Sequence, residues 1–198
     1  MVIGNQKNDV VKNSLLIVVP YDFITNKTDL SWRELYFGVK CGFILPDAAI
    51  DKAVKLIEQQ KKENSTTLFD LGSLYKHEVS LVEVYLVELA EQEIVQDITD
   101  IKEKWLFLIL SWLLNNQEQY NFLFAEVPYE IEGAYEKASV IWDDFDRISI
   151  IENLFVKKFI NDTSDFILNN DKLDLTDFYQ EWENYLNIQG ERFKLRII

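Results

Sequence analysis

The sequence predicts a mainly α fold, a compact bundle of about eight helices formed by a single domain over residues 1–198. Apolar residues recur at helical spacing, two capping patterns mark helix starts, and only 6 Gly and 3 Pro interrupt the 198 residues. Within this domain we expect a core over residues 20–155. A C-terminal helix-containing segment follows over 156–198, beyond a polar stretch that starts at Asn161.

The first two long helices have explicit boundaries in the sequence. Ser31–Glu34 is a capping box, in which the Ser and Glu side chains bond each other's backbone N–H groups. Gly42 suits the end of this helix, and Pro46 suits the first turn of the next. Because about three residues separate the two helices, we expect an antiparallel helical hairpin.

The remaining helices are predicted mainly from apolar periodicity. A second capping box, Ser80–Glu83, favours a helix over 80–93, although its valines favour strands. The segment 99–116 is apolar nearly all round, which predicts a central helix with helical hairpins packed around it. The others are expected at about 65–76, 127–143, 148–160 and 175–188.

Two segments have the pattern of β-strands. Leu15–Val19 is a short apolar run, and Arg192–Ile198 alternates basic and apolar residues. We expect them to pair as a minor two-stranded β element that joins the termini.

The composition excludes several classes of function. The chain has 34 acidic and 20 basic residues, a net charge of −14, which disfavours binding of nucleic acid. Cys41 and His77 are the single residues of their types, so no multi-histidine or cysteine-rich metal centre forms. Cys41 lies among apolar helix residues as a core residue, and His77 lies in a predicted loop without a G-x-S-x-G motif. We therefore expect no enzyme activity and no cofactor.

The apolar runs also argue against a membrane location. The longest, Trp105–Leu114, has about ten residues, whereas a helix needs about 20 to span a bilayer. Leu15–Val19 is too short for the apolar region of a signal peptide, and no cleavage site follows it. We expect a cytoplasmic protein that does not enter a membrane.

Acidic residues are concentrated in the last third of the chain. The segment from Glu126 to Glu152 contains eight acidic and two basic residues, and the segment from Asp162 to Glu191 contains eight acidic residues and one basic residue. In a helix, the spacings of Glu126 and Glu130 and of Glu132 and Glu136 would place like charges one turn apart, at a cost of roughly a few tenths of a kcal/mol per pair. Two interpretations remain open: a solvated face that keeps the protein soluble, and a docking surface for a basic protein partner.

The most acidic short segment is Trp142–Asp146. Its three carboxylates are of the type that binds Mg²⁺ or Ca²⁺, but the spacing is not that of an EF-hand. Aromatic residues bordered by charge are typical of interface hot spots. The alternatives to partner binding are a metal-dependent hydrolase that uses Asp143, Asp144 and Asp146, and a helical scaffold protein. The expected partner-binding residues are Glu130, Glu132, Glu136, Trp142, Asp143, Asp144, Phe145 and Asp146.

Three motifs resemble those of an uncharacterised bacterial helical family, a domain of unknown function. They are Leu30–Tyr36 with Gly38, Lys104–Leu108 continuing to Trp112, and Asp144–Asp146. The likeness covers about residues 20–155, and it implies no catalytic residues. The resemblance implies an association with immunity-like genes near secreted polymorphic toxins. The resemblance thus implies an immunity protein that neutralises a basic, nuclease-like toxin domain through its acidic surface.

Overall fold

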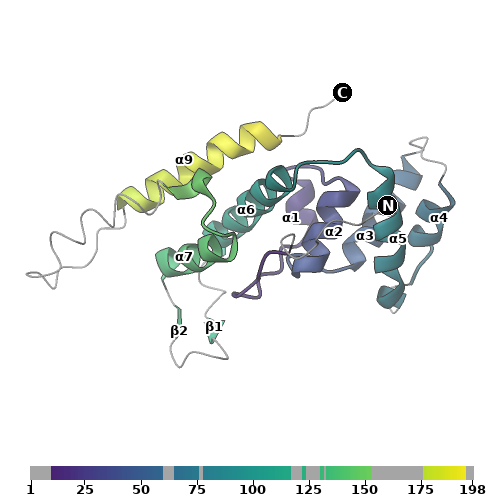
Figure 1. Cartoon of the computed structure of the whole chain (residues 1–198), viewed down its shortest axis with the longest axis horizontal. Helices are drawn as coiled ribbons and strands as arrows, with labels where there is room; N and C mark the ends of the chain where they lie inside the picture. Colours follow the sequence, from purple (N-terminus) through teal and green to yellow (C-terminus); the bar gives the residue numbers. More distant parts are fainter. Residues whose placement is uncertain are drawn as a thin grey trace, which may run out of the picture.

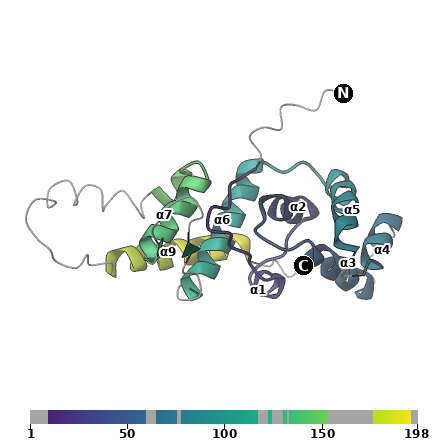
Figure 2. The ribbon, with the colours of Figure 1, turned by 90° about the horizontal axis from the view of Figure 1, so that it is seen from below.

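The computed structural model describes residues 10–59, 65–75, 78–116, 122–123, 130–131, 133–152 and 176–194. The described residues form eight α-helices, one 3₁₀ helix and one short strand pair, so the predicted mainly α fold is confirmed. Helices α2 to α5 gather at one end of an elongated molecule, and α6, α7 and α9 at the other (Figures 1 and 2). The helices are α1 (Tyr21–Thr25), α2 (Trp32–Cys41), α3 (Asp47–Glu58), α4 (Thr66–Gly72), α5 (Val79–Gln92), α6 (Ile98–Asn115), α7 (Ala134–Asp144), η4 (Ser149–Ile151) and α9 (Thr176–Phe193).

Helix α2 begins and ends as its sequence predicts. The Ser31 hydroxyl accepts a hydrogen bond from Glu34 N at 3.1 Å, and the Glu34 carboxylate accepts one from Ser31 N at 2.7 Å. Gly42 ends the helix with a φ of 74°, a left-handed conformation that glycine adopts without strain. The expected α2–α3 hairpin is not the main packing unit, because α2 packs chiefly on α5 and α3 on α4.

Helix α5 is confirmed, but the capping box predicted for it is wrong. The helix begins at Val79, so Ser80 lies inside its first turn. The Glu83 carboxylate instead pairs with Lys40 of α2 at 2.8 Å. The packing of α5 against α2 and α4 outweighs the strand preference of its valines.

Helix α6 is the central element, as expected. Its side chains from Trp105 to Ser111 are all buried, and α2, α7 and α9 pack against it. The approach of α2 is unusually close, because a Cβ at Gly38 would lie 2.0 Å from Cζ2 of Trp105. The Trp105 indole also donates to the Glu34 carbonyl at 2.8 Å, which locks the two helices together.

The strand pair does not come from the termini. It consists of β1 (Phe122–Leu123) and β2 (Glu130–Ile131), antiparallel with Phe122 opposite Ile131. The apolar run Leu15–Val19 buries alternate side chains without forming a strand. The Asn13 side chain bonds both N and O of Ile17, at 2.9 and 3.0 Å, and so takes the backbone groups that a strand partner would use.

The other end of the expected strand pair is helical. Arg192 and Phe193 belong to the last turn of α9, and residues 195–198 lie outside the described residues. Arg192 donates to Asp100 of α6 at 2.6 Å and to Glu103, which holds this turn against α6. The helix predicted over 175–188 therefore extends to Phe193.

Two helix boundaries in the acidic region also differ from prediction. Gly133 precedes α7, so the helix predicted over 127–143 begins at Ala134, and the backbone of Glu130 lies in β2. The segment predicted as a helix over 148–160 starts as a 3₁₀ helix with no side-chain cap from Asp146 or Ser149. Residues 153–160 lie outside the described residues.

None of the described helices combines the length and the apolar character that crossing a bilayer requires.

Candidate binding surface

The three carboxylates at the end of α7 are each engaged by a different part of the protein. Asp143 pairs with Arg147 one turn later at 2.7 Å, and Asp146 pairs with Lys102 of α6 at 3.4 Å. Asp144 turns to the N-terminal segment and accepts from Ser14 N at 2.8 Å and Ser14 Oγ at 2.6 Å. Within the described ranges, no three His, Cys, Asp or Glu residues converge on a metal position.

The contact between Asp144 and Ser14 is partly buried. Desolvation raises the pKa of Asp144, although both hydrogen bonds from Ser14 act in the opposite direction. The carboxylate thus connects residues 130 positions apart in the chain. Its role in the structure is to hold the N-terminal segment against α7.

We expect Asp144→Ala to lower the free energy of unfolding by about 1–3 kcal/mol, because both Ser14 donors lose their acceptor in a partly buried place. The matched control is Asp143→Ala, which removes an exposed ion pair and should cost about 0–1 kcal/mol. Urea denaturation of both variants measures the difference. Equal losses would show that the Ser14 contact is not structural.

The two aromatic residues of this segment differ in their availability. Phe145 is 2% exposed and stacks on Phe43, with ring centroids 5.7 Å apart. It belongs to the core, which corrects its expected role as a partner-binding residue. Trp142 is half-buried and donates from its indole to Ile148 O at 2.9 Å, with the Arg147 guanidinium 5.7 Å from its ring.

The remaining expected residues do not form one surface that the structure describes. Glu136 is exposed on α7. Glu130 is placed by its backbone in β2 and not in a helix, so the like-charge helical spacing inferred for it does not exist. Glu132 lies outside the described residues.

A polar concavity lies along α9. It consists of two adjoining hollows, about 520 and 560 Å³ in volume, that share Glu183 and Asn187. We call their combined lining the α9 groove. The hollow at the N-terminal half of α9 is lined by Asp177, Gln180, Glu181, Glu183, Asn184 and Asn187. The other is lined by Asn26, Lys27, Phe107, Ser111, Leu114, Asn115, Glu183, Leu186, Asn187, Gly190, Glu191 and Lys194.

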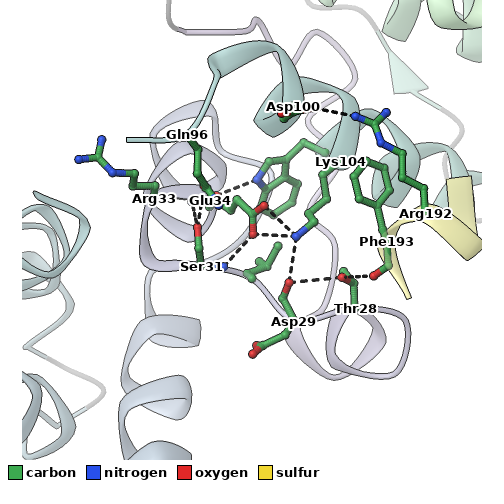
Figure 3. A network of polar contacts seen from close by, with 12 residues as sticks. Thr28, Asp29, Ser31, Arg33, Glu34, Gln96, Asp100, Lys104, Arg192 and Phe193 are labelled. Carbon is green, nitrogen blue, oxygen red and sulfur yellow. Dashed lines mark hydrogen bonds and ion pairs between the residues drawn. The ribbon is translucent and has the colours of Figure 1, made fainter. Parts of the chain in front are cut away.

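The face of α9 that lines the groove lies opposite the face that packs into the core. Phe178, Trp182 and Tyr185 are buried on that face, as their helical spacing predicts. At the far end of α9, the Thr28 hydroxyl donates to Phe193 O at 2.7 Å, beside the Arg192–Asp100 contact (Figure 3). Helix α9 is therefore fixed at its buried face and at its C-terminal turn.

A buried ion pair lies next to this anchor (Figure 3). The Lys104 ammonium is 2.7 Å from the Glu34 carboxylate and donates to Asp29 O at 3.1 Å. The Glu34 and Lys104 side chains are only 7% and 14% exposed. Because Glu34 is also the capping residue of α2, this network joins the start of α2 to α6.

The charge of the α9 groove changes along its length. Among the described residues, no Lys or Arg pairs with Asp177 or Glu183 at its N-terminal half. At the other half, Lys194 pairs with Glu191 at 3.2 Å, and Lys27 lies 5.1 Å from the Phe23 ring. The N-terminal half is thus the anionic part.

The α9 groove also contains neutral groups that form hydrogen bonds. Asn26, Asn115 and Asn187 line it, and each carries an amide that can donate and accept, although the Asn115 amide nitrogen already donates to Ser111 O at 2.8 Å. The buried Ser111 hydroxyl has no hydrogen-bond partner there. The arrangement suits a ligand with cationic groups at one end and peptide-like polar groups along its length.

The sequence indicated this groove only in part. The acidic excess from Asp162 to Glu191 pointed to this region. The polar face of the predicted helix over 175–188 was visible in its spacing, but the hollow against α6 and Asn26 required the tertiary packing.

A model of a family described as uncharacterized proteins conserved in bacteria, DUF2247, matches residues 21–190. No curated protein and no solved structure matches the chain.

Proposed function

The chain belongs to the DUF2247 family of uncharacterized proteins conserved in bacteria, and from this premise we propose that it is a non-enzymatic protein that binds a basic protein partner. We further propose that the partner is a toxin domain, nuclease-like in its positive charge, and that the chain is its immunity protein. The observation that carries the proposal is the α9 groove, in which Asp177 and Glu183 lack an ion pair with any described residue.

The binding mechanism follows from the charges in the groove. A net charge of −14 attracts a cationic partner over long distances and speeds its encounter with the protein. Lys or Arg side chains of the partner then pair with Asp177 and Glu183, while the asparagine amides bond its backbone. In a nuclease these are the side chains that hold substrate phosphates, so pairing with them prevents substrate binding.

The test begins with co-purification of the protein with the product of the neighbouring gene. For the complex, the triple variant Asp177→Asn, Glu181→Gln, Glu183→Gln is expected to raise the Kd by about 10- to 100-fold and to weaken its dependence on salt. The physical reason is the loss of three charges from the N-terminal half of the groove. Titration calorimetry at two ionic strengths measures both effects.

A matched control removes three exposed charges at the opposite end of the molecule (Figure 1). The variant Asp51→Asn, Glu58→Gln, Asp70→Asn changes the net charge equally on α3 and α4. It should change the Kd by less than about threefold, since those charges act only at long range. Equal effects of the two triple variants would contradict the placement of the interface in the α9 groove.

A further inference from the structure

A second hollow, with the opposite character, lies between α2, α5 and the start of α6. Its volume is about 310 Å³, within the range of small-molecule sites. Phe37, Val87, Ala90, Ile98 and Ile101 form an apolar lining, and Val10 at its edge is 61% exposed. In water this lining favours an apolar occupant.

The cation Arg33 lines this hollow. Its guanidinium donates to the carbonyl oxygen of Glu93 at 3.3 Å, and its Nε is buried without a hydrogen-bond partner. Among the described residues no carboxylate pairs with it, although the chain has 34 acidic residues. The side chain points away from the buried ion-pair network (Figure 3).

The carboxylate of Glu93 forms no ion pair with Arg33, because it accepts hydrogen bonds from the backbone instead. Glu93 accepts from the backbone N of Trp32 and of Arg33, both at 2.9 Å, and so caps the start of α2. Among the described residues, the Arg33 guanidinium therefore has only one hydrogen-bond acceptor, the backbone carbonyl oxygen of Glu93. It keeps donors free for an external acceptor.

Two other charged residues, Lys40 and Glu91, line the hollow. Lys40 is exposed and pairs with Glu83 at 2.8 Å, with its ammonium 5.9 Å from the Tyr36 ring. Glu91 is the acidic residue of the lining. A ligand anion is therefore best placed against Arg33, with its apolar part over Phe37 and Val87.

We propose that this hollow binds a small amphiphilic carboxylate, with the carboxylate on Arg33 and an alkyl chain on the apolar lining between α2 and α5. An Arg guanidinium matches a carboxylate with two parallel hydrogen bonds, and the surrounding low-polarity surface strengthens them. The site lies apart from the α9 groove and does not depend on the function proposed for it.

Decanoate is the probe for this proposal. Isothermal titration of the 198-residue protein should detect decanoate binding, and decyltrimethylammonium, which has the opposite charge, should not bind. Arg33→Met keeps an apolar stem but removes the charge, and it should weaken decanoate binding by at least about tenfold. Val87→Phe narrows the hollow from a half-buried position and should abolish binding.

Two control variants separate the site from general effects of charge and size. Arg147→Met removes an exposed cation near α7, and Val54→Phe enlarges a partly exposed residue of α3. Both should bind decanoate like the unchanged protein, and circular dichroism confirms that each variant is folded. The proposal is overturned if decanoate gives no heat, if decyltrimethylammonium binds as tightly, or if folded Arg33→Met retains full affinity.

Discussion

Replacement of Gly38 by alanine is expected to lower the free energy of unfolding by about 3 kcal/mol, a large effect for the addition of one methyl group. The added Cβ would lie 2.0 Å from Cζ2 and 2.5 Å from Cη2 of Trp105, well inside van der Waals contact. Trp105 cannot move aside, because it is fully buried and its indole bonds Glu34 O. The α2–α6 contact must open to accept the methyl group.

Urea denaturation of single and double variants tests this cause. Trp105→Leu alone should cost about 3–5 kcal/mol through the cavity that it leaves. In the double variant Gly38→Ala, Trp105→Leu, the total loss should be smaller than the sum of the two single losses. The reason is that Trp105→Leu removes the ring with which the methyl group of Ala at position 38 would clash. Additive losses would show that the steric contact is not the source of the effect.

Gly190→Ala is the matched control, a second glycine within a helix. A Cβ there would lie 3.9 Å from the Phe107 ring, which is an ordinary contact. Alanine is favoured over glycine in a helix by about 1 kcal/mol, so this variant should be as stable as the unchanged protein or more so. A loss similar to that of Gly38→Ala would contradict the packing described for α9.

Removal of one partner of the buried Glu34–Lys104 pair is the second large effect. We expect Lys104→Met to lower the free energy of unfolding by about 3–5 kcal/mol, since the Glu34 carboxylate then lies buried without its cation. The same change removes the hydrogen bond to Asp29 O. Thermal and urea denaturation measure the loss.

The double variant Lys104→Met, Glu34→Gln identifies the unpaired charge as the cause. It should be more stable than Lys104→Met alone, because no uncompensated carboxylate remains, and the Gln side chain still suits a capping box. Arg147→Met, which breaks an exposed pair, should cost about 0–1 kcal/mol. A Lys104→Met variant as stable as Arg147→Met would refute the importance of burial.

The acidic segment illustrates how far prediction from sequence extends to a site. The sequence identified Asp143, Asp144 and Asp146 correctly as a dense group of charges. Arg147 pairs with Asp143 at the local i,i+4 spacing, but Ser14 and Lys102, the partners of Asp144 and Asp146, lie far away in the sequence, and no local pattern predicted them. Long-range contacts, not spacing, decide whether a carboxylate is available to a partner.

The sequence by itself determined those elements of the protein that depend on contacts between neighbouring residues. The Ser31–Glu34 cap, the Gly42 stop and the apolar periodicity of α6 and α9 depend on groups within one or two turns of each other, so they were predictable. The tertiary structure alone decided that Asp144 holds the N-terminal segment through Ser14, that Phe145 lies in the core against Phe43, and that Arg33 lacks a carboxylate partner among the described residues. These outcomes depend on contacts between residues far apart in the chain, whose energies exceed the small local preferences that a sequence pattern reports.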